Sequence, residues 1–344
     1  MTLPSSGQIS MSQIRDEFFG SDPASIDQYY RGGGLVPNVP ANSNVPTSGA
    51  ITYEDFYSAR YEEIVTVTSS SNNLDVQGLF SSADWSSAKF KRVIINSGVV
   101  IGSTSTGSAA LTVPSNFGNT VILENNGSIR GAGGNGGVGG DAIRVPPGVP
   151  NAVEIENQGE VFGGGGAGGV GGTGGTSSCP PNPPTPTPCP CGSGNLRCEG
   201  GSCPCGGGST QCCCQAVGGL PQCRVVCCRP SGCTNPGGGN PPVSGGIGGA
   251  GGRGRGYTQS NLDGVNGSLG PDCSGPSGRT GGRGGRGGFG GTWGVTGERG
   301  DTGLNGNLGG GSAGTPGGSA GNYIINDSNV TWIGGRGTVA GGVA

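Results

Sequence analysis

The chain has 344 residues, of which 82 are glycine, and it carries a net charge of -3 with only 31% apolar and 11% charged residues. This composition excludes an ordinary globular protein with one large core and a charge-rich disordered chain, and the negative charge argues against binding nucleic acid. Histidine is absent, which removes the usual general base and the commonest metal ligand, so we expect neither an enzyme nor a cofactor.

Residues 1–61 contain a short motif three times, at 6–14, 21–29 and 48–56, with serine or threonine three residues before glutamine or aspartate. This spacing is typical of a capping box and predicts three short helices, capped by Ser10, Ser25 and Thr52. Such short helices are unstable alone, so we expect a docking segment that packs on a partner. A small self-contained helical cap is the alternative. The side chains expected to dock are Ile9, Ile14, Phe18, Tyr29, Tyr30, Phe56 and Tyr57.

The N-terminus has no basic and apolar signal segment, and no run of about 18 apolar residues follows it. The cysteine-rich and glycine-rich texture is nevertheless typical of an extracellular protein. We therefore expect synthesis in a host cytoplasm without a signal peptide, followed by release as part of a virus particle when the cell lyses.

Residues 62–130 contain β-branched runs bounded by Asn, Gly and Ser, which predict an all-β domain of short strands. A unit of strand, Asn-x-Gly-type turn and second strand recurs around Asn96, Asn125, Asn157 and, more loosely, Asn326. Repeated units of this kind predict stacked coils. The interval before the last copy is so long that residues 163–321 must be one excursion that returns to the same stack.

Glycine recurs with a period of three within 131–140, 168–175 and 281–291, and as Gly-x-y triplets in 294–309. This period matches the polyproline II helix, and recurring glycine lets backbones pack side by side. We expect a polyglycine II bundle within one chain. A collagen triple helix is the alternative, against which the triplets contain no proline and the phase slips at Trp293. The Arg-Gly steps are similar to RNA-binding segments. Because acidic residues balance their charge, we do not expect the chain to bind RNA.

All fourteen cysteines lie between positions 179 and 273. An even number of cysteines in a segment with few apolar residues predicts a disulfide-stapled knob. A zinc or iron–sulfur site is the alternative, although the Cys-x-x-Cys spacing is missing. The disulfide candidates are Cys179, Cys189, Cys191, Cys198, Cys203, Cys205, Cys212, Cys213, Cys214, Cys223, Cys227, Cys228, Cys233 and Cys273.

The glycine-rich segments on both sides of this knob should run out and back, which places the knob at the exposed distal end. We expect it to form a receptor-binding tip together with the loop 257–278, whose glycine phase is broken. The receptor-binding candidates are Asn195, Leu196, Arg197, Leu220, Gln222, Arg224, Tyr257, Gln259, Asn261 and Asp263.

Three segments resemble tail-fibre proteins of tailed bacteriophages. Residues 3–57, from LPSSGQISMSQIRDEF to TSGAITYEDFY, resemble the N-terminal segment of tail-fibre and other virion structural proteins, through the motif Ser-Gly-x-Ile-Ser-x-x-(Asp/Gln). Residues 93–137 resemble the β domain that follows it. The phased glycine runs resemble the polyglycine II sandwich of tip adhesins from T-even-type phages. The resemblance covers about residues 1–175 and 244–344 and leaves out the insert 176–243.

The resemblance implies a non-enzymatic tail fibre that forms a homotrimer and is located in the virion, in the phage tail. It implies docking to baseplate or tail proteins through the N-terminus and binding of a host polysaccharide or outer-membrane protein at the other end. In the similar adhesins, loops between the glycine-rich motifs bind the receptor. Three alternatives are a purely structural glycine-rich extracellular protein, a metal-storage protein and a fibre-borne polysaccharide depolymerase. The carboxylates available to a depolymerase are Glu124, Glu154, Glu156 and Glu160.

The sequence therefore predicts an elongated fibre that is mainly β with non-regular segments. Its predicted parts are a docking segment, a β domain, glycine-rich legs with a β repeat, a cysteine-rich insert, a polyglycine II or collagen-like segment and a closing β repeat. Their boundaries are 1–61, 62–130, 131–175, 176–243, 244–321 and 322–344.

Overall fold

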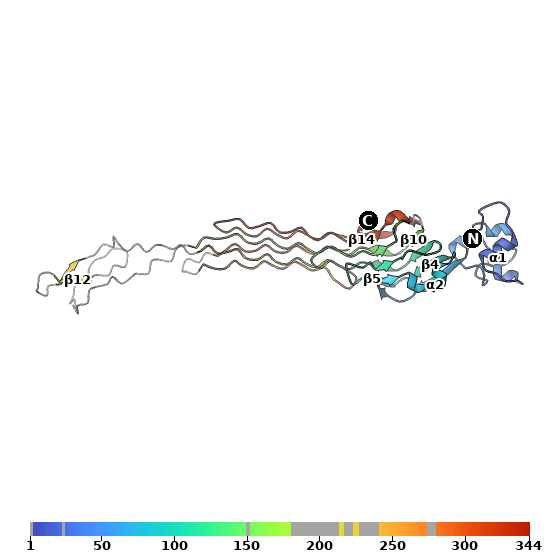
Figure 1. Ribbon diagram of the computed structural model, residues 1–344, viewed down its shortest axis with the longest axis horizontal. Coiled ribbons are helices and arrows are strands. Elements are labelled where there is room, and N and C mark those ends of the chain that lie inside the picture. The colour runs from blue at the N-terminus through green and yellow to red at the C-terminus, as the bar shows by residue number, and fades with distance from the viewer. Residues whose placement is uncertain are drawn as a thin grey trace.

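The computed structural model describes residues 3–22, 25–148, 152–179, 213–216, 223–226, 241–273 and 280–344. The molecule is elongated (Figure 1), with an N-terminal module at one end, a stack of β-coils next to it and a glycine-rich rod that extends from the stack. None of the helices in these ranges has the length and apolar character that a bilayer crossing requires. The same ranges hold no group of three or more cysteine or carboxylate side chains arranged to bind a metal ion.

The N-terminal module, residues 3–61, is built from one short α-helix and three 3-10 turns. In α1, Ser10 forms the expected capping box with Gln13: the Gln13 N–H donates to Ser10 Oγ at 3.3 Å, and the Ser10 N–H donates to Gln13 Oε1 at 2.8 Å. The two later motif copies form 3-10 turns, and Ser25 makes no side-chain cap. Four residues are enough for a 3-10 turn but not for two α-helical turns. The elements are α1 (Met11–Glu17), η1 (Ile26–Tyr29), η2 (Pro40–Asn42) and η3 (Tyr53–Phe56).

The module has its own apolar core, which contains four of the residues expected to dock. Ile14, Phe18, Tyr29 and Phe56 are between 0% and 4% exposed and pack together. The Phe56 ring lies 6.2 Å from that of Phe18 and 6.5 Å from that of Tyr29. Short helices are stabilised here by burying one large side chain from each motif copy in a shared core. The module therefore holds its shape through its own core, and these four side chains belong to that core.

Fifteen short strands form three parallel five-stranded sheets, and successive strands visit the three sheets in turn. The first sheet contains β1 (Glu62–Val67), β4 (Phe90–Ile95), β7 (Val121–Asn125), β10 (Val153–Asn157) and β15 (Val330–Trp332). The second contains β2 (Ser71–Asn72), β5 (Val100–Gly102), β8 (Ser128–Arg130), β11 (Glu160–Phe162) and β16 (Thr338–Ala340). The third contains β3 (Leu74–Asp75), β6 (Leu111–Thr112), β9 (Ile143–Arg144), β14 (Asn322–Ile325) and β17 (Gly342–Val343).

This order describes a β stack of five coils, with the long excursion inserted between β11 and β14 of the fourth coil. The C-terminal residues therefore complete the stack that begins at residue 62 and are not a separate unit. Inward side chains such as Ile101, Leu123 and Ile155 are fully buried between the sheets. Short helical segments lie around the stack: η4 (Gln77–Leu79), α2 (Ser82–Ser86) and η5 (Asp327–Asn329).

The strand register corrects two of the predicted repeat equivalences. Asn125 pairs with Asn157, as the repeat requires, but its other partner is Ile95 and not Asn96. The fourth repeat copy is also out of register. The repeat aligns Asn326 with Asn157 at the end of β10, but the strand that pairs with β10 is β15, and Asn326 follows β14, which belongs to another sheet. Coils that differ in length at their corners shift the turn residues relative to the strands, and a sequence alignment across the turn does not detect this.

Arg92 is a buried charge of the β stack that contacts three carboxylates. Its side chain is 2% exposed and forms ion pairs with Glu62 at 2.6 Å, Glu124 at 2.9 Å and Glu156 at 3.0 Å. Burial alone would lower the pKa of the guanidinium, but the hydrogen bonds that it donates to Glu62 and Glu156 outweigh burial and raise the pKa. Four coils of the stack, those of β1, β4, β7 and β10, are thus joined through one cation.

We expect Arg92→Met to destabilise the β stack by about 3–5 kcal/mol, because Glu62, Glu124 and Glu156 would face one another without a counter-charge. Urea unfolding measures this effect. Arg130→Met, which removes an exposed pair with Glu160, is the control and should cost less than about 1 kcal/mol. Equal losses in the two variants would contradict this role of Arg92.

The rod consists of six extended segments, here called legs, that alternate in direction. They are leg 1 (163–179), leg 2 (241–256), leg 3 (260–273), leg 4 (280–293), leg 5 (295–306) and leg 6 (310–321). A short hairpin, 131–140, covers leg 1 near the β stack, where the Gly134 N–H donates to Gly165 O at 2.8 Å. Beyond the rod, β12 (Cys213–Ala216) and β13 (Cys223–Val226) pair antiparallel.

Backbone hydrogen bonds with a period of three join the legs. Leg 1 donates to leg 2 from Gly168, Gly171 and Gly174 at 2.7–2.9 Å. Among the described residues, legs 1 and 4 are each bonded to four other legs, and leg 3 to only two. Legs 1 and 4 carry two glycines per three residues and leg 3 carries one. Glycine therefore occupies the positions that face a neighbouring backbone, because a Cβ there would meet that backbone.

Candidate functional sites at the two ends

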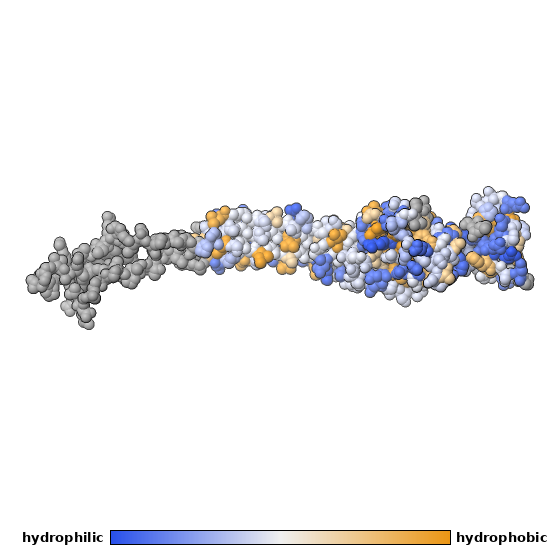
Figure 2. Space-filling view, viewed as in Figure 1, coloured by the Kyte–Doolittle hydropathy of each residue, from blue (hydrophilic) through white to orange (hydrophobic). Residues whose placement is uncertain are grey.

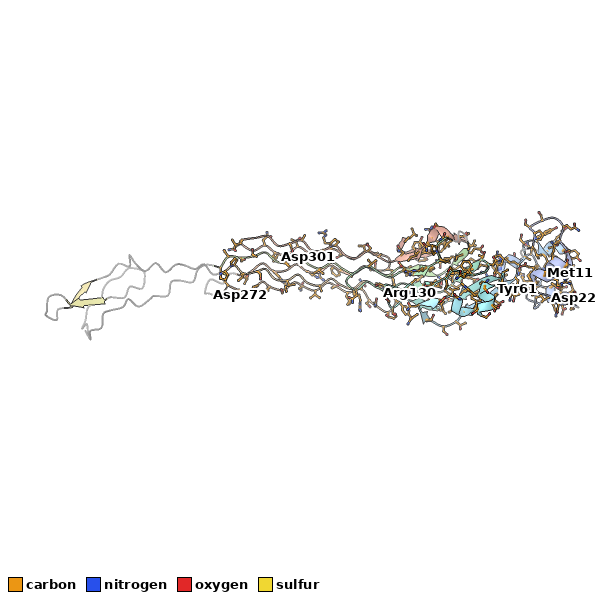
Figure 3. All side chains as sticks on the ribbon, viewed as in Figure 1. Met11, Asp22, Tyr61, Arg130, Asp272 and Asp301 are labelled. Atoms are coloured by element: carbon orange, nitrogen blue, oxygen red, sulfur yellow. A yellow bond between two sulfur atoms is a disulfide. The ribbon has the colours of Figure 1, made fainter. Side chains whose placement is uncertain are left out.

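An apolar cavity of about 410 Å³ opens on the N-terminal module. It is lined by Met11, Ile14, Ile26, Tyr29, Ile51, Thr52, Tyr53 and Phe56. Figure 3 shows Met11 at the end of the molecule opposite to the rod. The cavity is thus exposed at the N-terminal extreme of the described residues.

The three motif copies contribute to this cavity in the same way. Ile14, Tyr29 and Phe56 occupy the last position of their copies and form the buried floor. Three positions earlier stand Met11, Ile26 and Tyr53, which are 38%, 54% and 53% exposed. Each copy therefore supplies one floor residue and one exposed rim residue. We call this arrangement the cup. The sequence analysis identified the repeat but not its rim, because all bulky residues of such short helices were treated alike.

The loop that begins at Tyr257 lies at the base of the rod, which corrects its predicted place at the tip. The Tyr257 N–H donates to Gly131 O at 3.1 Å, and a Cβ on Gly102 of β5 would lie 2.1 Å from the Tyr257 ring. Gln259 Oε1 accepts a 2.8 Å hydrogen bond from Gly133. Both residues are therefore committed to the junction between the rod and the β stack.

Leg 3 continues from this loop, so its other two receptor-binding candidates also belong to the rod. Asn261 follows the basal turn, and Asp263 pairs with Arg286 of leg 4 at 3.4 Å. The glycine phase that the sequence analysis treated as broken continues in leg 3, at Gly264 and Gly267. One glycine per turn is sufficient for a leg with two neighbours.

The Arg-Gly steps have a structural use in the rod. Arg283 and Arg286 of leg 4 donate through Nε, each at 3.2 Å, to the carbonyl oxygens of Gly267 and Gly264 of leg 3. The guanidinium of Arg286 also lies 4.5 Å from the centre of the Phe289 ring. Because these arginines satisfy backbone carbonyls of a neighbouring leg, the RNA-binding interpretation has no support in this part of the chain.

The chain leaves the described rod at its distal end, where Figure 3 places Asp272. Ser177 and Val243 exchange backbone hydrogen bonds of 3.0 and 2.9 Å, which hold the ends of legs 1 and 2 together. Cys179 and Cys273 form a disulfide between the ends of legs 1 and 3. Asn307 Oδ1, in the turn between legs 5 and 6, accepts a 2.6 Å hydrogen bond from the Ser178 N–H.

Most predicted tip residues lie outside the described residues. These are Asn195, Leu196, Arg197, Leu220 and Gln222, with Cys189, Cys191, Cys198, Cys203, Cys205, Cys212, Cys227, Cys228 and Cys233. Arg224 is in β13, where it pairs with Gln215 of β12. Cys213 and Cys214 are in β12, and Cys223 is in β13.

The four carboxylates considered for a depolymerase all form ion pairs. Glu124 and Glu156 contact Arg92, and Glu154 lies 3.6 Å from Arg60. Glu160 accepts hydrogen bonds from Ser128 at 2.8 Å and from Arg130 at 3.0 Å, and these bonds lower its pKa. A glycosidase needs one carboxyl group with a raised pKa to act as the acid, whereas the pKa of Glu160 is lowered.

Comparison with known proteins gave one family and one solved structure. Residues 62–344 match the family described as phage tail fibre adhesin Gp38. The solved structure is the gp37-gp38 adhesin tip complex of the bacteriophage S16 long tail fibre. A chain of that complex is 18% identical to this one, with 99% of this chain and 95% of that chain covered, at a TM-score of 0.39. No curated protein matches the chain significantly.

Proposed function

The chain belongs to the phage tail fibre adhesin Gp38 family and is a host-recognition tail fibre protein. We propose that it binds the receptor at the distal end of the rod. The observation that carries this proposal is the path of the chain. The described residues that flank 180–240 and 274–279 lie at the end of the rod opposite to the N-terminal module. With the turn between legs 5 and 6, this end is the described part best placed to meet a cell surface, and the proposed receptor is a polysaccharide or an outer-membrane protein.

We propose that the rod is a polyglycine II scaffold that holds this tip away from the virion. Its period-three hydrogen bonds of 2.7–3.1 Å and its glycines at every contact position support this interpretation. Every leg is bonded to at least two others among the described residues. A lattice of this kind is stiff, so the tip keeps a fixed orientation relative to the β stack.

We propose that the cup attaches the adhesin to the tail. Three exposed apolar rim residues surround an apolar floor, and an exposed apolar surface of this kind favours a protein partner. Because three similar copies surround one cavity, the partner that fits best presents three equal apolar groups. The threefold end of a trimeric tail or baseplate protein has this property.

The expected homotrimer of this chain came from the resemblance to phage tail fibres. In the described residues, the legs bond to one another and the β stack and the module each bury their own apolar side chains. We therefore propose that one copy of the chain folds by itself and that the trimer belongs to the partner. Sedimentation of the purified chain as a monomer would support this proposal.

We expect the combined substitution of Met11, Ile26 and Tyr53 by Asp to abolish attachment to particles, because three charges would line an apolar cavity. The floor residues are unchanged, so thermal unfolding should be close to that of the unsubstituted chain. The measurement is the amount of adhesin that co-sediments with adhesin-free particles. The control is Ile247→Asp, at a rod side chain that is 74% exposed. Normal attachment of the triple variant would reject the cup as the docking surface.

A further inference from the structure

A second cavity, of about 340 Å³, opens on the outside of the β stack. It lies at the corner where the chain passes from the first sheet to the second, and three successive coils contribute to it. The corner turns contain glycine, and a Cβ on Gly159 would lie 2.0 Å from Gly127 O of the neighbouring coil. We call this cavity the corner groove. Besides the turn glycines, its lining residues are Val99, Val100, Asn126, Ser128, Arg130 and Glu160.

One wall of the corner groove is a row of three side chains in strand register. Ser128 of β8 pairs with Val100 of β5 on one side and with Glu160 of β11 on the other. Successive side chains of a strand point to opposite faces of the sheet. The row therefore points outward, because the next residue of each strand is fully buried: Ile101, Ile129 and Val161.

The polar groups of the corner groove are held in place and keep free hydrogen-bonding capacity. Glu160 Oε2 accepts from Ser128 Oγ at 2.8 Å and from Arg130 Nη2 at 3.0 Å. Asn126 Nδ2 donates to Glu124 Oε1 at 3.1 Å. Within the described part of the chain, three further atoms of these side chains make no hydrogen bond: Glu160 Oε1, Asn126 Oδ1 and Arg130 Nη1. Two acceptors and one donor are thus available to a ligand.

The chemistry of the corner groove selects a neutral ligand. Arg130 and Glu160 lie 3.0 Å apart, so their charges compensate each other, and an anion would meet the carboxylate while a cation would meet the guanidinium. Neighbouring hydroxyl groups of a sugar ring suit this arrangement, because each hydroxyl both donates and accepts. Val99 and Val100 supply an apolar wall for the C–H face of the ring.

We propose that the corner groove binds neutral pyranose units of a saccharide through two adjacent hydroxyl groups. Glu160 Oε1 accepts from one hydroxyl, and Arg130 Nη1 donates to its neighbour. The Arg130 guanidinium also lies 5.7 Å from the centre of the Trp293 ring, which orients it before the ligand binds. Among the described lining residues, Glu160 is the carboxylate, and its lowered pKa keeps it ionised. The groove therefore binds the saccharide without supplying the acid that hydrolysis needs.

The place of the corner groove on the fibre suggests its use, and this step rests on the proposed function of the distal end. Figure 3 shows Arg130 on the β stack, close to the base of the rod. With a rise of about 3.1 Å per residue, leg 1 places the groove roughly 50 Å from the distal end. Saccharide chains that stand out this far from a cell surface would contact the groove while the tip is on its receptor.

The test measures binding of three methyl pyranosides, of mannose, galactose and rhamnose, to the full chain by saturation-transfer NMR, with glucuronate as the charged probe. We expect at least one methyl pyranoside to bind. Glu160→Gln and Asn126→Ala should each weaken this binding at least about fivefold, because each removes a hydrogen-bonding group. Thr338→Ala is the matched control, since Thr338 pairs with Glu160 in the next coil but does not line the groove. All three variants should unfold at the temperature of the unsubstituted chain.

Three results would overturn the proposal. The first is that the unsubstituted chain binds none of the methyl pyranosides, and the second is that both groove variants bind them as well as Thr338→Ala does. Tighter binding of glucuronate than of the pyranosides would show an anion site and not a neutral saccharide site. Failure of the proposed tip looks different: exchange of residues 180–233 for a linker should leave pyranoside binding unchanged, whatever its effect on adsorption.

Discussion

Replacement of Gly172 by Val is expected to open the rod and to lower its unfolding temperature by about 5–10 °C. A Cβ on Gly172 would lie 1.8 Å from Ser312 O of leg 6, much closer than van der Waals contact. Leg 1 and leg 6 would have to separate, which also breaks the hydrogen bond from Ser312 to Thr173 O, 2.8 Å long. Forced separation in a close-packed region typically costs about 1–3 kcal/mol or more. Thermal unfolding and limited proteolysis measure the effect.

Gly137→Ala is the matched control for this substitution. Gly137 lies in the short hairpin of the same glycine-rich region, but no atom lies within 4 Å of its Cβ position, and its φ is not positive. The Ala variant should unfold at the same temperature as the unsubstituted chain. If Gly172→Val had no more effect than Gly137→Ala, the glycines would act as a mobile linker, and the packed rod would be wrong.

Exchange of residues 180–233 for a short Gly-Ser linker is expected to abolish adsorption to the host and leave the particles assembled. The linker can close easily, because Ser177 and Val243 are paired at the ends of antiparallel legs. Cys179 and its partner Cys273 stay in place. The rod, the β stack and the cup are unchanged, so the variant should still attach to particles. Adsorption counts of particles carrying either chain provide the measurement.

A second variant distinguishes between receptor binding at the tip and receptor binding at the base of the rod. Replacement of Tyr257 and Gln259 by Ala affects the basal loop, which contacts Gly131 and Gly133. It should lower stability at the junction but leave adsorption intact at low temperature. Loss of adsorption only in this second variant would move the receptor-binding site to the base of the rod.

Much of the fold could be predicted from the sequence because glycine in the rod marks the positions where one backbone contacts another. A position that faces a neighbouring backbone, such as Gly168, excludes any Cβ. The period of three, the excursion over 163–321 and the return to the β stack therefore follow from the pattern. Asn125 and Asn157 stack in register for a similar local reason, since the Asn125 amide donates to Asn157 Oδ1 at 2.7 Å.

The errors come from contacts that no local pattern records. Residues Met11 and Ile14 both look like the apolar face of a short helix, and only the packing of three copies decides that Ile14 is buried and Met11 is exposed. The base of leg 3 was misplaced because a leg with two neighbours needs only one glycine per turn. Its period-three signal is then weaker than that of leg 1, although both legs belong to the same lattice.

The surface of the rod also explains why composition alone says little about the site. Its apolar side chains point outward at intervals, as Figure 2 shows for the described part of the rod. Ile247, Leu269 and Leu304 are 61–74% exposed, and the space inside is filled by backbone. A sequence method that places apolar residues in a core therefore fails for the rod, while it succeeds for Ile101 and Leu123 in the β stack.

The most direct test of the account is an image of assembled particles that carry a small peptide tag at Gly310, the first residue of leg 6 after the turn between legs 5 and 6. Electron microscopy with a tag-specific label is predicted to show the label at the free ends of the fibres, farthest from the tail, with an N-terminal tag closer to the tail on the same fibres. A label at Gly310 that lies nearer to the tail than the N-terminal label would contradict the proposed orientation, and with it the assignment of the distal end to receptor binding.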